Sequence, residues 1–327
     1  MSPIVNVSVL GASGNLGECI VPALLKSGFV VTVIIRPGSR GYTPPKNDST
    51  DSKAVTIKEA AYDDVSGLTA ALQGQDALVE AFNPAASVHQ RTIVRAALAA
   101  GIEHLITNEF GMDTFNPNVA EAPIGKPKAL AQRALEEELQ AAAANDKPVS
   151  LTWTGIITGV WYDWTIRTGL FWMNPTTRTI TRYGSGNQRT SLSRLALTGE
   201  AVVAVLRNPE HFRNRPAYIA SHTVSTNELI ALVNEISESP EKSWNVVDIP
   251  DMEAFMTEGM RLWDEDTKNG VEDRLNSQAW VTIVIATLFD EKNRFGTDLE
   301  EKLEPGWDEG REKLKDHLKQ LIIEADS

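Results

Sequence analysis

The sequence predicts an α/β fold in which helices cover both faces of a parallel sheet. Apolar runs of strand length alternate with helical segments through the first half of the 327-residue chain, and this alternation is typical of parallel sheets. A glycine-rich turn joins the first apolar run to the first helix, as happens where a buried strand leads into a helix. Beyond Gly155 the alternation stops, which indicates a second part of different construction.

The expected elements of the first half follow in order. The first strand covers Val5 to Leu10, and the first helix runs from about Asn15 to Ser27. Further apolar runs predict strands, and amphipathic or Ala-rich stretches predict helices. The strands are expected at 29–35, 55–58, 76–82, 103–107 and 149–154, and the helices at 65–72, 87–100 and 127–144, with a surface loop over 36–53.

The second half is less regular. Aromatic residues cluster between Val160 and Pro175, and the polar stretch 176–191 is typical of loops and short strands. Helical patterns dominate the remainder. We expect helices at 195–206 and 226–236 with a strand at 217–220 between them, and mainly helices from Met252 onward, ending with 308–325.

Composition and charge exclude several classes of protein. Hydrophobic residues make up 42% and charged residues 23% of the chain, as in ordinary globular proteins. The net charge is −13, and residues 241–327 contribute most of it with 22 acidic and 11 basic side chains. We therefore expect no nucleic-acid partner. The longest apolar run, Val281 to Phe289, is too short to cross a membrane, so we expect no membrane insertion.

Cysteine usage indicates the compartment. Cys19 is the single cysteine, so the chain forms no internal disulfide. Residues Met1 to Val9 also lack the basic region of a signal peptide. Together these observations favour a reducing interior, and we expect a cytoplasmic location.

The turn after the first strand carries most of the functional information. Gly11, Gly14 and Gly17 have G-x-x-G-x-x-G spacing between a strand and a helix. One glycine allows the tight turn, one lets backbone N–H groups approach a pyrophosphate, and one lets the helix pack closely on the strand. The helix N-terminus adds free donors and a partial positive charge. This pattern predicts a dinucleotide site formed by Gly11, Ala12, Ser13, Gly14, Asn15, Leu16 and Gly17.

The fold class is therefore a doubly wound parallel Rossmann sheet with a second, smaller and mostly helical substrate lobe. We place the cofactor-binding domain at residues 1–155. Residues 156–327 form mainly the substrate lobe, with a segment at about 190–225 returning to the Rossmann domain.

The residues after the second strand distinguish NAD from NADP. A carboxylate at this point accepts hydrogen bonds from the ribose 2′-OH, whereas an arginine pairs with a 2′-phosphate. The chain has Arg36-Pro37-Gly38-Ser39-Arg40 here and no acidic residue. The alternative is a loop with two solvated arginines. A planar guanidinium immediately after the strand favours a phosphate, so we expect NADPH, with Arg36, Ser39 and Arg40 in its site.

A candidate acid/base residue lies on the helix after Pro127. The Tyr-x-x-x-Lys pair of ordinary short-chain reductases is matched only by Tyr42 and Lys46, and two prolines between them forbid the helix it needs. Lys128 instead shares a helical stripe with Ala131, Leu135 and Leu139. Burial and the helix dipole both lower a lysine pKa here, which suits proton transfer near neutral pH. The alternative is a surface lysine in the first turn.

Several segments together resemble one known family. They are GASGNLG at the first turn, Arg36 after the second strand, HLITNEFGMD at 104–113, KALAQRALEEEL at 128–139 and WTGIITGVWYDW at 153–164. The chain resembles the isoflavone-reductase-like, NmrA-like branch of the short-chain dehydrogenase/reductase superfamily, and the last segment resembles its fungal members. The resemblance is clear over about the first 165 residues and looser to about residue 240.

This resemblance implies roles for particular residues. The family's acid/base lysine matches Lys128, which would also contact the cofactor. The family's aromatic residue after the sixth strand, which packs near the nicotinamide, is replaced by Ile156 or Ile157. The second arginine of an Arg-Arg pair matches Arg133, but the first is Gln132. We also expect Asn83 and Ile157 to belong to the cofactor site.

Other polar and aromatic residues have simpler interpretations. The five histidines show no metal-ligand spacing, so we expect no metal. The run Glu136 to Glu138 is typical of a helix surface. Glu109 lies after the fifth strand, where ligands of such sheets bind, although holding the loop is its more natural role. The aromatic residues of the 160–175 cluster, which include Trp161, Tyr162 and Trp164, either form core or wall a pocket for a flat substrate.

The sequence leads to one functional hypothesis and one alternative. The hypothesis is an NADPH-dependent reductase that transfers hydride to a C=O, C=C or C=N bond of a small aromatic secondary metabolite, with Lys128 as acid/base. The alternative is a non-catalytic NADP sensor that binds a protein partner, as NmrA-type members of the family do. We also consider a homodimer, although the sequence does not determine the oligomeric state.

Overall fold

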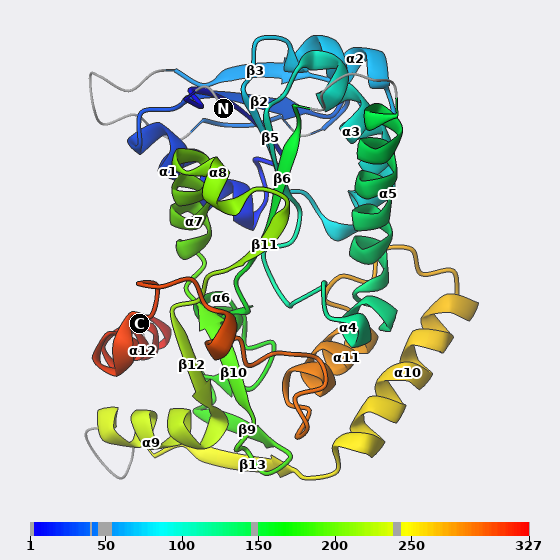
Figure 1. Ribbon diagram of the computed structural model, residues 1–327. Helices are drawn as coiled ribbons and strands as arrows, with labels where there is room; N and C mark the ends of the chain where they lie inside the picture. Colours follow the sequence, from blue (N-terminus) through cyan, green and yellow to red (C-terminus); the bar gives the residue numbers. More distant parts are fainter. Residues whose placement is uncertain (1–2, 40, 45–53, 145–149, 238–242, 327) are drawn as a thin grey trace. The chain divides into compact units, whose positions relative to one another are not determined.

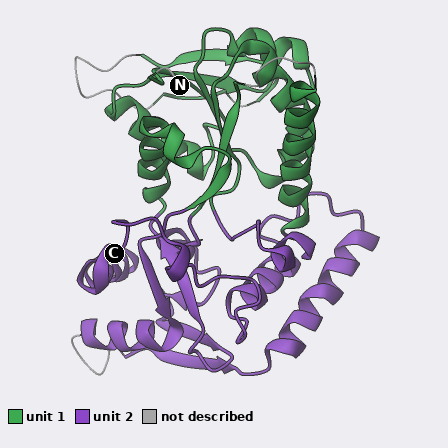
Figure 2. Ribbon diagram, in the orientation of Figure 1, with its two compact units in different colours: residues 1–110, 125–157, 195–217 green, residues 111–124, 158–194, 218–327 purple. Residues whose placement is uncertain are grey.

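The computed structural model describes residues 3–39, 41–44, 54–144, 150–237 and 243–326 (Figure 1). The chain divides into two compact units, coloured separately in Figure 2. Unit 1 comprises residues 1–110, 125–157 and 195–217, and unit 2 comprises residues 111–124, 158–194 and 218–327. The assignment of a cofactor domain and a substrate lobe to particular residue ranges stays a prediction.

Unit 1 is built on a seven-stranded sheet. Its strands lie in the order β11-β6-β5-β4-β1-β2-β3, and the pairs from β6 to β3 are parallel. The chain reverses direction across the sheet between β1 and β4, which is the switch point where ligands of such sheets bind. The strands are β1 (Asn6–Leu10), β2 (Val30–Ile35), β3 (Thr56–Glu59), β4 (Ala77–Glu80), β5 (His104–Thr107), β6 (Thr152–Ile157) and β11 (Arg215–Tyr218).

Helices cover the sheet on both faces, as the doubly wound prediction requires (Figure 1). On one face α1 packs on α7, so closely that a Cβ on Gly199 would lie 2.6 Å from the carbonyl oxygen of Cys19. On the other face α3 packs between α2 and α5. The central strands are apolar because both of their faces are buried. The helices are α1 (Asn15–Lys26), α2 (Val65–Leu72), η1 (Pro84–His89), α3 (Gln90–Ala100), α5 (Lys126–Ala143), α7 (Leu197–Arg207) and α8 (Pro209–Phe212).

Unit 2 combines helices with two small sheets. Both sheets have three strands, in the orders β12-β10-β7 and β13-β9-β8. Helices α10 and α11 pack together, and α12 packs on α6 and α9. The strands are β7 (Val160–Trp161), β8 (Met173–Asn174), β9 (Thr179–Tyr183), β10 (Arg189–Ser193), β12 (His222–Ser225) and β13 (Asn245–Ile249). The helices are α4 (Pro117–Glu121), α6 (Tyr162–Thr168), α9 (Thr226–Ile236), α10 (Met252–Lys268), α11 (Gln278–Leu288), η3 (Glu300–Lys302) and α12 (Gly310–Ala325).

The predicted elements agree with this fold, with a few corrections. Helices α2 and α9 have the predicted bounds. The strand expected at 149–154 instead covers Thr152–Ile157, because its pairing with β5 runs from Thr152 to Gly155, beyond the predicted end. The helix expected at 87–100 is two elements, since Pro84 starts a 3₁₀ turn before α3. Strand β13 and helices α4, α6 and α8 were not predicted individually, because each is too short or too polar for its period to show.

Candidate cofactor and active site

The glycine turn has the close packing that its spacing predicts. Gly11 has φ +83°, and a Cβ there would lie 2.4 Å from the carbonyl oxygen of Ala81. A Cβ on Gly17 would lie 2.3 Å from the backbone of Ala12. Helix α1 begins after Gly14 with no side-chain cap, so its first N–H groups face outward. Asn15 is exposed, whereas Leu16 and Gly17 are buried against the sheet. This is the geometry of a phosphate-binding turn.

A cavity of about 230 Å³ lies beside this turn. It is at the switch point, between the ends of β1, β2 and β4. It brings together most of the predicted cofactor residues, including the exposed Arg36 at the end of β2. Arg40 lies outside the described residues. The lining consists of Gly11, Ala12, Ser13, Gly14, Ile34, Ile35, Arg36, Ser39, Tyr62, Ala81, Phe82, Asn83 and Ala86.

Tyr62 is a site residue that the sequence analysis missed. Its ring is 5% exposed and lies under the guanidinium of Arg36, with Cζ 5.7 Å from the ring centroid. It also packs against Phe82, with centroids 5.5 Å apart. Burial raises the pKa of Tyr62 to about 12, although Arg36 and a hydrogen bond with the Gly11 backbone act in the opposite direction. Tyr62 is therefore neutral and holds Arg36 beside the phosphate turn.

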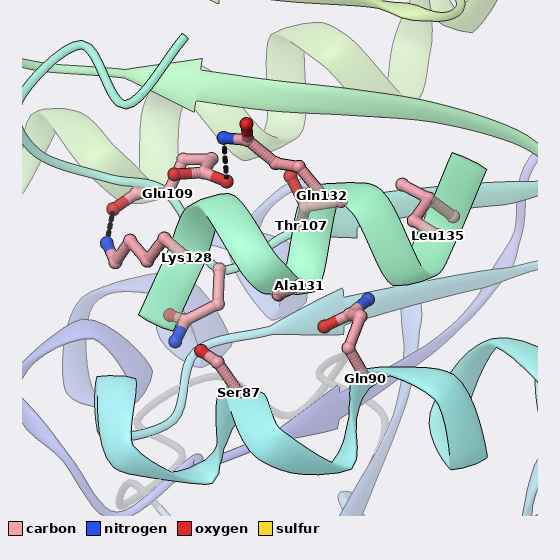
Figure 3. Close-up of a pocket in the computed structure, with 9 residues that line it drawn as sticks. Ser87, Gln90, Thr107, Glu109, Lys128, Ala131, Gln132 and Leu135 are labelled. Carbon is pink, nitrogen blue, oxygen red and sulfur yellow. Dashed lines mark hydrogen bonds between the residues drawn. The ribbon is translucent and has the colours of Figure 1, made fainter. Parts of the chain in front are cut away.

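Lys128 and Glu109 lie together at the carboxyl edge of the same sheet (Figure 3). The Lys128 ammonium donates a hydrogen bond to the main-chain carbonyl of Glu109. The Glu109 carboxylate accepts a hydrogen bond of 3.0 Å from Gln132 Nε2. Burial lowers the pKa of Lys128, and the negative charge of Glu109 opposes part of that effect. The predicted inward stripe is present, because Lys128, Ala131 and Leu135 line one small cavity of about 10 Å³.

The turn that presents the Glu109 carbonyl has an unusual backbone. Phe110 has φ +44°, in the left-handed region that a bulky residue rarely adopts. The Phe110 N–H donates to the carbonyl of Ile156 at 2.7 Å, and its side chain is buried. These contacts compensate for the strain and keep the turn after β5 in place. Ile157, the next residue of β6, is fully buried and lines neither cavity.

The Lys128 cavity is separate from the cofactor cavity, but one segment contributes to both. Asn83 and Ala86 line the cofactor cavity, whereas Ser87 and Gln90 line the Lys128 cavity. Asn83 also caps η1, since its Oδ1 accepts from the N–H of Ala85 at 2.9 Å. The segment from η1 to the start of α3 therefore links the two groups of predicted site residues.

The predicted aromatic residues lie in unit 2 and differ from one another in burial. Tyr162 belongs to the buried core of that unit, and its OH is 2.6 Å from Nδ1 of His317. This position favours the core interpretation for Tyr162. Trp161 and Trp164 are partly exposed and meet edge to face at 6.3 Å. Their contact with substrate stays a prediction.

One surface prediction was wrong. Glu138 is buried rather than exposed, and its carboxylate pairs with Arg91 and Arg95 on α3. Those arginine bonds lower the pKa of Glu138. Glu138 thus ties α5 to α3 and supports the helix that carries Lys128.

Two kinds of feature are absent from the part of the chain that the structure describes. No cluster of three or more His, Cys, Asp or Glu side chains could hold a metal ion there. None of the described helices combines the length and the apolarity that a membrane span requires.

Known proteins resemble both the sequence and the fold. The NmrA-like family matches residues 5–144. Oxidoreductase aprR of Aspergillus flavus is 30% identical over 234 residues, which cover 71% of this chain and 74% of that protein. Oxidoreductase poxI of Penicillium oxalicum is 31% identical over 228 residues, 69% of this chain and 68% of that protein. The solved structure of AtPrR2 with NADP⁺ and (+)-pinoresinol has a TM-score of 0.69 at 19% identity, covering 98% of this chain and 100% of that one.

The Rossmann fold and these relatives define an oxidoreductase. The chain belongs to the NmrA-like family.

Proposed function

We propose that this protein is an NADPH-dependent reductase that transfers hydride to a C=O, C=C or C=N bond of a small aromatic metabolite. The observation that carries the proposal is the arrangement at the carboxyl edge of one sheet. A phosphate-binding turn and a cation share one cavity there, and a lysine of lowered pKa lies at the same edge. Ligands of doubly wound sheets bind at this edge.

The residues of the cavity fit a dinucleotide phosphate. Gly11 allows the turn to approach the Ala81 backbone where no Cβ would fit, and Gly14 adds no side chain beside the start of α1. The uncapped start of α1 offers N–H donors, and Arg36 offers a guanidinium for the 2′-phosphate. When bound, NADPH supplies the hydride. The protein then binds and orients it and keeps water from the reacting groups.

Lys128 is assigned the proton transfer. Its lowered pKa increases the fraction of neutral amine at physiological pH, so the side chain can both accept and donate a proton. The Glu109 carbonyl holds Nζ in place, and Gln132 holds the Glu109 side chain. Lys128 would act on the substrate directly or through a water.

The relatives support the substrate class. AtPrR2 was solved with (+)-pinoresinol, an aromatic compound, together with NADP⁺. The fungal relatives are named as oxidoreductases. The partly exposed Trp161 and Trp164 are the aromatic surface of unit 2 that we assign to such a substrate.

The proposal is tested by following NADPH oxidation with a panel of aromatic ketones, enones and imines. Wild type should oxidise NADPH with at least one class, and Lys128→Ala should lose most of kcat, about 100-fold, while its affinity for NADPH changes little. Lys126→Ala, on the exposed face of the same helical turn, is the matched control. Normal turnover by Lys128→Ala would refute the lysine assignment. Tight NADPH binding without reduction of any candidate would favour the non-catalytic sensor instead.

A further inference from the structure

A buried carboxyl group lies at the carboxyl end of β4. The Glu80 side chain has no exposed surface. Its Oε1 accepts a hydrogen bond of 2.8 Å from Gln90 Nε2, and its Oε2 accepts one of 3.2 Å from the N–H of Asn108. Both donors are neutral, and no ion pair to Glu80 occurs within the described ranges. Burying an ionised carboxyl group without a cationic partner is costly, which favours its neutral form.

Hydrogen bonds from Asn108 join the carboxyl ends of the neighbouring strands β4 and β5. The Glu80 carboxyl accepts from the Asn108 main chain, and Asn108 Nδ2 donates to the carbonyl of Phe82 at 2.8 Å. Phe82 lines the cofactor cavity. The residue after Asn108 is Glu109, whose carbonyl accepts from Lys128. A continuous series of contacts therefore runs from the end of β4 to the ammonium group on α5.

We propose that Glu80 is a positioning residue that holds the Asn108–Glu109 turn and, through this turn, the ammonium group of Lys128. Its consequence for catalysis rests on the proposed function, whereas its effect on the turn does not. A side chain that holds the acceptor of a proton-transfer group fixes the geometry on which the reaction depends.

The charge state of Glu80 gives this contact a pH dependence. Burial raises the pKa of Glu80 to about 8, the bonds from Gln90 and Asn108 lower it in part, and the negative charge of Glu109 raises it. The neighbouring Tyr62 is neutral, with a pKa of about 12. Of the two strands that flank β4, β1 contains no titratable residue, and β5 contains His104, which pairs with Ala77 at the opposite end of β4. At pH 7 Glu80 is therefore a neutral acid, and the amide of Gln90 can pair with either of its charge states.

Ionisation works against the closed turn. A solvated carboxylate has a pKa near 4.5, so local opening that hydrates Glu80 favours loss of its proton. Below about pH 4.5 both the open and the closed turn carry the proton, so ionisation does not oppose closing. Between about pH 4.5 and 8 closing the turn must reprotonate Glu80, so the ratio of closed to open turn falls about tenfold for each pH unit, and above about pH 8 both states are ionised and the fall stops.

Hydrogen exchange tests the inference without cofactor or substrate. Protection factors of the Asn108 and Glu109 amides would be measured by NMR between about pH 5 and pH 9 in wild type, Glu80→Gln and Glu80→Leu. In wild type the protection should fall about tenfold per pH unit up to about pH 8 and level off above that pH. Glu80→Gln keeps an acceptor for Asn108 but cannot ionise, so its protection should not change with pH. Glu80→Leu removes the acceptor and should lose at least tenfold at pH 7. Glu137→Gln, the same change at a half-exposed site on α5, should behave as wild type.

Identical pH profiles in wild type and Glu80→Gln would overturn the inference, as would wild-type protection in Glu80→Leu. If Glu80→Leu does not fold, the comparison with Glu80→Gln still decides. If wild type reduces a substrate of the panel, its kcat should decline as the pH rises toward about 8, and that decline should be absent in Glu80→Gln. Failure of wild type to reduce any substrate would count against the proposed function alone, since hydrogen exchange is measured on the free protein.

Discussion

The ammonium group of Lys128 donates a hydrogen bond to the main-chain carbonyl of Glu109. This contact joins the first turn of α5 to the residue that lies just beyond β5. A main-chain acceptor carries no full charge, so it orients the lysine without strongly stabilising its charged form. The Glu109 carboxylate, which Gln132 holds nearby, is the opposing charge that raises the pKa of Lys128. The Glu109 carbonyl thus orients the ammonium group, while the Glu109 carboxylate offsets part of the burial that lowers the pKa of Lys128.

Removing the Glu109 charge should lower the pKa of Lys128 further. Burial already holds this pKa below 10.5, and Glu109 counteracts burial. Glu109→Gln keeps the main-chain acceptor and removes only the charge. The measurement is an NMR titration of ¹³C-methylated lysines, with Lys128→Arg to assign the signal. A Lys128 signal that titrates at higher pH in Glu109→Gln would contradict this account.

Gly11→Ala should destabilise the fold more than the same change at another left-handed glycine. Gly11 and Gly38 have φ of +83° and +71°, so alanine is strained at both positions. Only at Gly11 does the new Cβ also meet backbone, 2.4 Å from the Ala81 carbonyl oxygen, whereas nothing lies within 4 Å at Gly38. We expect losses in the free energy of unfolding of about 3 kcal/mol for Gly11→Ala and about 1 kcal/mol for Gly38→Ala. Equal losses in urea unfolding would show that the close approach is unimportant.

Arg36→Asp should weaken NADPH binding far more than NADH binding. The substitution removes the cation proposed for the 2′-phosphate and places a carboxylate where a ribose 2′-OH could use it. We expect the ratio of the two Kd values to change at least tenfold in favour of NADH. Fluorescence titration of both cofactors measures it directly. A similar loss for both would refute the 2′-phosphate assignment.

Tyr62 should influence the same preference through Arg36. The ring lies 5.7 Å below the guanidinium, and a cation–π contact of this kind contributes about 0.5–1 kcal/mol. Tyr62→Leu should therefore reduce the NADPH preference about threefold. Tyr62→Phe retains the ring and should keep the wild-type ratio, which separates stacking from the hydroxyl. If the phenylalanine variant shows the same loss as the leucine variant, the ring is not the cause.

The sequence predicted those site residues that belong to local patterns. The glycine turn, Arg36 and Lys128 are recognisable because their neighbours in the chain define a strand end or a helix face. Tyr62 and Glu80 are different, since they gain their roles only when the strand order brings them beside β1 and β5. One signal for Glu80 was present. It is the only charged residue between Leu78 and Phe82, within a run whose pattern predicts burial on both faces.

The same reasoning explains the error at Glu138. Three consecutive glutamates are typical of a solvated helix face, and two of them are exposed. The third turns toward α3, where Arg91 and Arg95 provide its partners. Those arginines lie more than 40 residues earlier in the chain. No helical period within α5 reveals a partner on another helix, so tertiary pairing was needed to place this residue.

His104 should make the fold less stable in mild acid. It is fully buried on β5, with Nδ1 2.8 Å from Thr152 Oγ1 and Nε2 3.1 Å from Thr154 Oγ1. Burial lowers its pKa from 6.5 to about 4. Between these values the unfolded chain binds a proton that the folded chain does not, so the stabilisation is complete above pH 6.5 and is lost as the pH falls toward 4. The full loss is about 3 kcal/mol.

Urea unfolding between pH 4.5 and 7.5 measures this effect by comparing wild type with His104→Gln. The variant should be less stable at pH 7, because glutamine cannot replace both ring contacts, but its stability should fall less steeply below pH 6.5. His211→Gln supplies the control for the chemical change, since His211 is exposed. Other titrating groups, Glu80 among them, contribute equally to both proteins, so the difference between the two slopes isolates His104. Parallel slopes would mean that His104 is protonated in the folded state, which its two hydroxyl partners and its burial argue against.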